Sequence, residues 1–191
     1  MAYPKITVNT GLAQRVIASD SIPIPYPNLP QLTGTTTATT TNKLVDVGAD
    51  FSNVVVGDIV YNDTDLTVAT VTEVETSTIL VLSADIMTSG ETYTIFQGGP
   101  IFEQRIDSSS GCLLYVGSNA SIVQDIQATS PADPGVGTAD PRYVDVAVKV
   151  VQGNTVVFQN FKVGNYLPVQ ITKLMSTGSS PEVKTNCIAI W

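Results

Sequence analysis

The 191-residue chain contains no histidine and only two cysteines, Cys112 and Cys187. Without histidine, the Ser-His-Asp and Cys-His nucleophile arrangements, histidine metal ligands and the usual proton donor near neutral pH are excluded. The two cysteines have apolar neighbours and lack the CxxC spacing of zinc sites. We interpret them as buried thiols, with a disulfide as the alternative. The sequence therefore predicts no catalytic residue, no metal site and no cofactor.

Charge is also scarce in this chain. Charged residues make up 14% of the sequence, against about 25% in an average globular protein. Nine basic and seventeen acidic side chains give a formal net charge of −8, which repels phosphate backbones and anionic lipid head groups at long range. We therefore expect neither nucleic acid nor a membrane as a partner. The apolar fraction of 43% is too high for a disordered chain.

Long apolar runs and helical periodicity are both missing. No run approaches the roughly 18 apolar residues that a membrane-spanning helix needs, and residues 1–11 lack the apolar segment of a secretory signal. The longest apolar runs, 112–116 and 187–191, have the length of single strands. No window of a dozen residues shows a helical period. We expect an all-β protein that is made in the cytoplasm.

Composition divides the chain into residues 1–34, 35–98 and 99–191. The first region holds a short strand pattern and then four prolines between residues 21 and 30. Proline fixes φ and removes a backbone donor, so we expect an extended N-terminal arm and strand. The second region holds five short strand patterns between residues 43 and 96, one of them after a Gly-Asp turn. This spacing predicts an inserted small β-barrel module.

The third region contains the clearest strand. Between residues 143 and 151, valines alternate with polar and charged residues, which predicts a strand with one wet face. Gly153 offers the positive φ of a tight hairpin, and residues 155–161 return as the partner strand. Residues 129–141 predict a long exposed loop. We predict an all-β fold in which the N- and C-terminal regions form a jelly-roll-like β-sandwich around the inserted module.

Paired carboxylates are the remaining route to catalysis. Glu73 and Glu75 lie two residues apart, as do Asp63 and Asp65 at a turn. We interpret both pairs as solvated acids, because the carboxylates of glycosidases usually come from different elements. The turn with Asp63 and Asp65 also begins like a calcium loop but lacks the closing bidentate glutamate. We therefore predict that the protein is not an enzyme.

Five segments of the C-terminal region carry recognisable motifs. They are Cys112–Asn119 with Leu-Tyr-Val-Gly, Val156–Phe161, Gly164–Ile171, Ser176–Ser180 and Ile188–Trp191. In this order they resemble the head spike base proteins, small β-proteins of tailed phages and gene transfer agents. The resemblance covers residues 112–191. The loop at 129–141, residues 181–184 and the inserted module depart from the family pattern.

The resemblance implies a structural component of a virion. It would act on the particle surface as a head spike base, cement or capsid decoration protein that anchors a fibre or stabilises the capsid. The partners it implies are other copies of the chain in a pentamer or trimer, the major capsid protein or other virion proteins, and a host surface glycan. The alternatives are a baseplate or tail-fibre adaptor and, in a different class, a carbohydrate-binding module whose aromatic rings stack on sugars.

We expect an assembly interface on the proline-rich arm and the C-terminal strands. The candidate residues are Pro23, Pro25, Tyr26, Tyr166, Leu167, Pro168 and Trp191. Proline within a strand favours a sheet edge, and a tryptophan after an alternating strand adds apolar area at the end of the chain. Edges and apolar area of this kind suit a protein that completes its fold by assembling.

Overall fold

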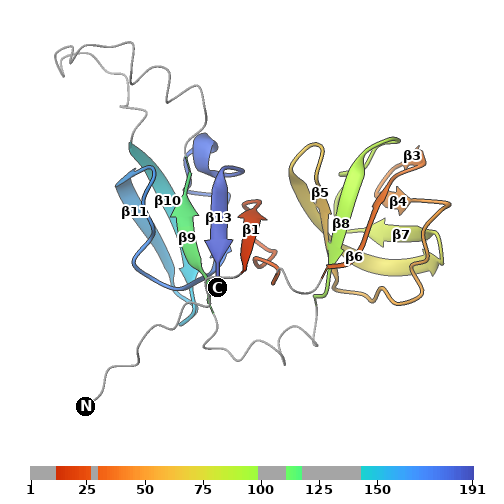
Figure 1. The fold of residues 1–191 in the computed structure, drawn as a ribbon, viewed down its shortest axis with the longest axis horizontal. Helices are drawn as coiled ribbons and strands as arrows, with labels where there is room; N and C mark the ends of the chain where they lie inside the picture. The colour runs from red at the N-terminus through yellow and green to blue at the C-terminus, as the bar shows by residue number, and fades with distance from the viewer. Residues whose placement is uncertain (1–11, 27–29, 99–110, 118–142) are drawn as a thin grey trace, which may run out of the picture. The chain divides into compact units, whose positions relative to one another are not determined.

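The computed structural model describes residues 12–26, 30–98, 111–117 and 143–191 (Figure 1). The elements are β1 (Ala13–Val16), β2 (Pro30–Thr35), β3 (Ala38–Thr40), β4 (Lys43–Val45), β5 (Ile59–Asn62), β6 (Thr67–Thr76), β7 (Ile79–Leu82), β8 (Thr92–Phe96), β9 (Leu113–Val116), β10 (Tyr143–Val150), β11 (Thr155–Lys162), β12 (Ile171–Leu174), the 3-10 turn η1 (Pro181–Val183) and β13 (Cys187–Ile190). The predicted all-β class is confirmed. No helix within the described residues is long and apolar enough to cross a membrane.

The chain divides into two compact units. Residues 1–18 and 111–191 form the sandwich unit, and residues 19–110 form the inserted module. The module begins earlier than the sequence predicts. Residues 30–34, expected in the arm, lie in β2, because β2 pairs with β8 of the module.

Parts of two sequence predictions fall outside the described residues. They are residues 1–11 and 27–29 of the expected arm and the expected loop at 129–141. Residues 12–26 are described and contain β1, which pairs with β13 near the end of the chain. The N- and C-terminal regions therefore share one sheet, as predicted.

The sandwich unit contains two three-stranded antiparallel sheets, with strand orders β1-β13-β9 and β11-β10-β12. Residues 164–171 connect them by pairing with the free side of β9. The Leu167 N–H bonds to Leu114 O at 2.9 Å, and Ile171 and Cys112 exchange two backbone hydrogen bonds. Strand β9 thus has partners on both sides. Among the strands described in this unit, β1 and β11 are the outermost.

Strand alternation builds the core of the sandwich unit. Every second side chain of β9 and β13 is buried, namely Leu114, Val116, Cys187 and Ala189. The intervening side chains of both strands lie on the opposite face of the sheet. Because both strands are apolar at every position, the fold and not the sequence pattern sets which side chains face the core.

Strand β10 departs from the predicted alternation. Val146, Ala147 and Val148 are all buried, although Ala147 lies on the face expected to be wet. The turn after β12 covers this face, because Ser179 Oγ accepts the Ala147 N–H at 2.9 Å and a Cβ built on Gly178 would lie 3.2 Å from the Ala147 Cβ. The predicted wet face is thus corrected at Ala147 by a segment distant in sequence.

Strands β10 and β11 form the predicted hairpin. Gly153 has a φ of +88°, which glycine adopts without steric cost. The ladder is interrupted by a β-bulge at Asn160, whose φ is +52° and whose N–H bonds to Asp145 Oδ1 at 2.9 Å. Asparagine tolerates this left-handed conformation better than most residues, so the sequence accommodates the bulge.

The inserted module is a curled seven-stranded sheet with the order β2-β8-β5-β6-β7-β4-β3 (Figure 1). Its edge strands β2 and β3 are consecutive in the chain and are separated only by Thr36 and Thr37. The Thr36 N–H bonds to Glu91 O, and the Thr37 N–H bonds to Val45 O. One edge of the sheet therefore continues directly into the other, which gives the module its barrel-like form, in agreement with the prediction.

The module has its own apolar core. Its buried members are Leu44, Phe51, Val54, Val60, Ala69, Val71, Leu80, Leu82, Met87, Tyr93 and Ile95. Asp58, which has no exposed surface, ties the turn before β5 to the residues after β8. Its carboxylate accepts the N–H groups of Val55 and Gly98, each at 2.9 Å. Gly57 has a φ of +97°, which confirms the predicted Gly-Asp turn.

Candidate assembly surface

One face of the β1-β13-β9 sheet points away from the core of the sandwich unit. Strand register aligns its side chains in rows across the three strands. The rows are Arg15-Ile188-Tyr115 and Ala13-Ile190-Leu113. Tyr166 continues the first row, because it forms a bridge with Tyr115. We call Leu113, Tyr115, Tyr166, Ile188 and Ile190 together the Tyr166 face.

The Tyr166 face is apolar and accessible to solvent. Tyr166 is 55% exposed and Ile188 is 39% exposed, and the other members are half-buried. The rings of Tyr115 and Tyr166 lie 5.2 Å apart at 57°, within the range that aromatic pairs favour. The face therefore presents two rings and branched aliphatic side chains on a sheet, a surface suited to an apolar partner.

The composition of the Tyr166 face is unusual for a wet sheet surface. When one face of an antiparallel sheet packs on the core, the other is normally polar. Here the outward positions of β13 carry Ile188 and Ile190, and those of β9 carry Leu113 and Tyr115. The exposed Arg15 is the charged member of the rows. An apolar outward face in this place points to a contact with another molecule.

Tyr166 is held by the turn that precedes it. Gly164 has a φ of +82°, and its N–H bonds to Val116 O at 2.7 Å. Leu167, the residue after Tyr166, is fully buried, and Pro168 is exposed. Of these three predicted interface residues, Tyr166 and Pro168 lie at the surface. Leu167 is corrected to a core residue, because its N–H pairs with β9 and its side chain faces inward.

Trp191 lies at the end of the chain and is half-buried. Its N–H bonds to Leu12 O at 3.2 Å, which continues the pairing of β13 with β1. By strand alternation it shares the side of Ala189, opposite to Ile188 and Ile190. Trp191 is therefore outside the Tyr166 face.

The other predicted interface residues belong to the inserted module. Pro25 is buried, and Pro23 and Tyr26 are half-buried. The predicted set is thus divided between the two units of the chain.

Sequence analysis missed Tyr115 and Ile188 as surface residues. Each strand carried a signal for an outward face, because alternate residues of 113–116 and of 187–190 must point away from the core. The pairing of the two strands, which places Tyr115 opposite Ile188, cannot be read from either segment alone.

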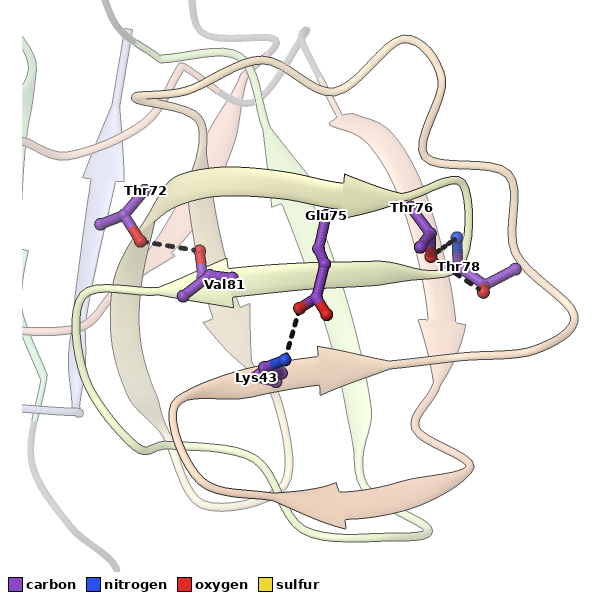
Figure 2. A network of polar contacts seen from close by, with 6 residues as sticks. All are labelled: Lys43, Thr72, Glu75, Thr76, Thr78 and Val81. Carbon is purple, nitrogen blue, oxygen red and sulfur yellow. Dashed lines mark hydrogen bonds and ion pairs between the residues drawn. The ribbon is translucent and has the colours of Figure 1, made fainter.

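A second exposed surface, on β4, β6 and β7 of the module, is polar (Figure 2). Lys43 Nζ forms an ion pair with Glu75, and Thr72 Oγ1 donates a hydrogen bond to Val81 O at 3.1 Å. Two further threonine hydroxyls meet at the β6–β7 turn. Surface ion pairs of this kind contribute about 0–1 kcal/mol. The contacts match the interpretation of Glu75 as a solvated acid.

The turn between β5 and β6 carries Asp65, whose carboxyl group lies beside that of Glu91, the residue before β8. Asn62 Oδ1 accepts the N–H groups of Thr64 and Asp65 at 2.9 and 3.0 Å, which is an Asx turn. The Thr88 N–H bonds to the Glu91 carboxylate and lowers its pKa, whereas contact with Glu91 raises the pKa of Asp65. Among the described residues, no three His, Cys, Asp or Glu side chains gather to hold a metal ion. Turn chemistry thus accounts for this cluster.

Both cysteines are buried free thiols, as interpreted from the sequence. Cys187 pairs with Val116, which lies four residues after Cys112 on the neighbouring strand. Four strand residues span about 13 Å, beyond the roughly 7 Å that a disulfide tolerates between Cα atoms. Burial raises the pKa of each thiol to about 12. Neither thiol is suited to nucleophilic chemistry.

The two units differ in charge. Residues 19–110 hold twelve of the seventeen acidic side chains and two of the nine basic ones, a formal net charge of −10. Residues 1–18 and 111–191 hold five acidic and seven basic side chains, a net charge of +2. The Tyr166 face thus lies on the unit that is nearly neutral, where repulsion between copies is weakest.

No protein-family model, curated protein or solved structure matches the chain. Its function is therefore argued from the geometry above and from the sequence resemblance.

Proposed function

We propose that this chain is a self-assembling structural subunit of a tailed-phage-like particle, in the role of a head spike base or capsid decoration protein. It would sit on the particle surface, bind other copies of itself and capsid or other virion proteins, and anchor a fibre or stabilise the capsid. No catalytic step is assigned to it. The observation that carries the proposal is the Tyr166 face, an apolar sheet surface on a nearly neutral unit.

An apolar face that is exposed to water carries a free-energy cost that burial against a partner removes. Exposed contiguous apolar patches on soluble proteins commonly mark contacts with other proteins. Tyrosine is enriched at the centre of such contacts, where its ring loses contact with water and its hydroxyl keeps a polar partner. Tyr115 and Tyr166 supply two such rings side by side. The resemblance of residues 112–191 to spike base proteins supplies the particle context.

The apparent mass of the purified protein tests self-assembly through this face. We expect an oligomer by light scattering after size exclusion. Replacing Ile188→Asp or Tyr166→Ser should lower the apparent mass, because a charge or a lost ring at the centre of the contact leaves apolar area unmatched. Val47→Asp is the matched control, since Val47 is a 73% exposed valine of the inserted module. A wild-type monomer, or an oligomer that both face variants leave intact, contradicts the proposal.

Mass spectrometry of purified particles tests the particle context. Closed assemblies follow the symmetry of their site, so about five copies per vertex support a spike base and about six per tail support a baseplate adaptor. The absence of the chain from particles would contradict the virion role.

A carbohydrate-binding module is the second candidate, favoured by the exposed ring of Tyr166 beside Tyr115. Aromatic faces stack on the apolar faces of sugars. This role predicts a monomer that binds on a glycan array and loses binding with Tyr166→Ser. The assembly role predicts that the same substitution changes the mass of the protein.

A further inference from the structure

The edge strand β11 exposes apolar side chains along a segment without charge. No charged side chain occurs between Val150 and Phe161. Val156 and Val157 are 37% and 46% exposed. Soluble proteins usually protect such edges with lysine, proline or a bulge. In β11 these devices are confined to its end, at the Asn160 bulge and the following Lys162.

The backbone of β11 has a regular set of outward hydrogen-bonding groups. The hairpin begins with a bond from Val150 N–H to Asn154 O, and hydrogen-bonded pairs alternate along an antiparallel ladder. The paired positions of β11 are therefore 154, 156 and 158. On the other side of β10, Ala147 O accepts a bond from the segment after β12, as the same alternation requires.

The N–H and C=O groups of Thr155 and Val157 consequently point away from β10. Among the described strands, β10 is the one that pairs with β11. Val157 is the centre of the uncharged segment 155–159, so its outward N–H and C=O are complementary to those of a second copy that is rotated by 180° about Val157.

We propose that two copies of this chain pair through β11 in antiparallel fashion about a two-fold axis at Val157. In this register Val157 faces Val157 of the second copy, and Thr155 faces Gln159 of the second copy. The outward N–H and C=O of Val157 then meet those of Val157 in the second copy. The sheet β12-β10-β11 continues across the axis into its copy.

Side chains support the same register. Val156 would face Phe158 of the second copy on one side of the sheet, twice by symmetry. Aromatic and β-branched side chains that lie opposite each other stabilise antiparallel pairs. No like charges oppose each other in the paired segment, because residues 155–159 are uncharged.

The bulge limits the length of the paired segment, and the two-fold symmetry limits the contact to one partner. Asn160 turns the strand out of regular pairing and is held there by Asp145. Because the same strand serves in both copies, the contact is closed and does not propagate into a fibre. This inference deepens the proposed self-assembly and rests on it, but uses a surface separate from the Tyr166 face.

Site-specific cross-linking tests the register. Directly opposed residues of a hydrogen-bonded antiparallel pair have Cα atoms about 5.5 Å apart, within the range of a disulfide. Val157→Cys should therefore give a disulfide-linked dimer under mild oxidation. Thr155→Cys is the matched control, because its two copies would lie about 14 Å apart and should not link. The native thiols are buried and do not compete.

The charge variant Val157→Lys gives an independent readout. Two lysines opposed at the axis repel, so the apparent mass should fall about twofold relative to Val157→Thr, which keeps a neutral β-branched side chain. If Val157→Cys does not link, links no better than Thr155→Cys, or if Val157→Lys leaves the mass unchanged, the β11 pairing is overturned. An oligomer that persists in those cases and depends on Ile188 leaves the proposed function standing. A wild-type monomer overturns both.

Discussion

Asp58 is a buried carboxylate that accepts backbone N–H groups from two segments distant from each other in sequence. It accepts the N–H groups of Val55 and Gly98 and has no exposed surface. Removing it takes the acceptor from the buried Gly98 N–H and from the part-buried Val55 N–H. A buried donor left without an acceptor costs about 1–3 kcal/mol. We expect Asp58→Ala to lower the free energy of unfolding of the module by at least that amount.

Chemical denaturation followed by circular dichroism measures this effect. Asp50→Ala is the control, because Asp50 is exposed and its carboxylate bonds to the nearby Ser52. Equal losses for the two variants would contradict the importance of burial at Asp58.

The two thiols offer a test that depends on pH. Burial raises their pKa to about 12, whereas an unfolded thiol titrates near 8.5. A raised folded pKa means that the folded state is stabilised fully below about pH 8.5 and loses this advantage as the pH rises toward 12. We expect native Cys112 and Cys187 to resist iodoacetamide at pH 8.5 and to react once the chain is unfolded, as read by mass spectrometry. Rapid native alkylation at that pH would contradict their burial.

At the scale of elements, the segment 164–171 places one residue in the core and its neighbour at the surface. Leu167 is fully buried beside β9, whereas its neighbour Pro168 is exposed. Truncating a buried leucine typically costs about 2–5 kcal/mol. We expect Leu167→Ala to destabilise the sandwich unit by that amount and Pro168→Ala to change its stability by less than about 0.5 kcal/mol. Thermal unfolding compares the two; similar shifts would place Leu167 at the surface.

The positions of several strands in the sequence were predictable. Which segments pack against each strand was not. Short apolar runs located β9 and β13, alternation located β10, and Gly153 located the hairpin. Burial of Ala147 depends on the turn at Gly178, which no local pattern of β10 indicates. The Tyr166 face likewise depends on the register between β9 and β13.

At the scale of the whole molecule, each unit has its own core, which predicts two separable unfolding transitions. Trp191 is the single tryptophan and lies in the sandwich unit, so its fluorescence reports that unit. Leu80→Ala, in the module core, should shift the transition seen by circular dichroism by about 2–5 kcal/mol and leave the Trp191 transition unchanged. Leu167→Ala should shift the transition that Trp191 fluorescence reports and leave the second transition seen by circular dichroism, that of the module, unchanged. Coincident shifts by both probes would show that the units unfold as one.

The all-β class, the inserted module and the hairpin at Gly153 could be predicted from the sequence alone. These follow from periodicity, turn residues and composition, which act over a few neighbouring residues. The pairing of the strands was needed to place Leu167 in the core, to bring Tyr115, Tyr166 and Ile188 to one face, and to make β11 an outermost strand among those described. Those properties depend on which strands become neighbours and in what register, and contacts between distant segments set both.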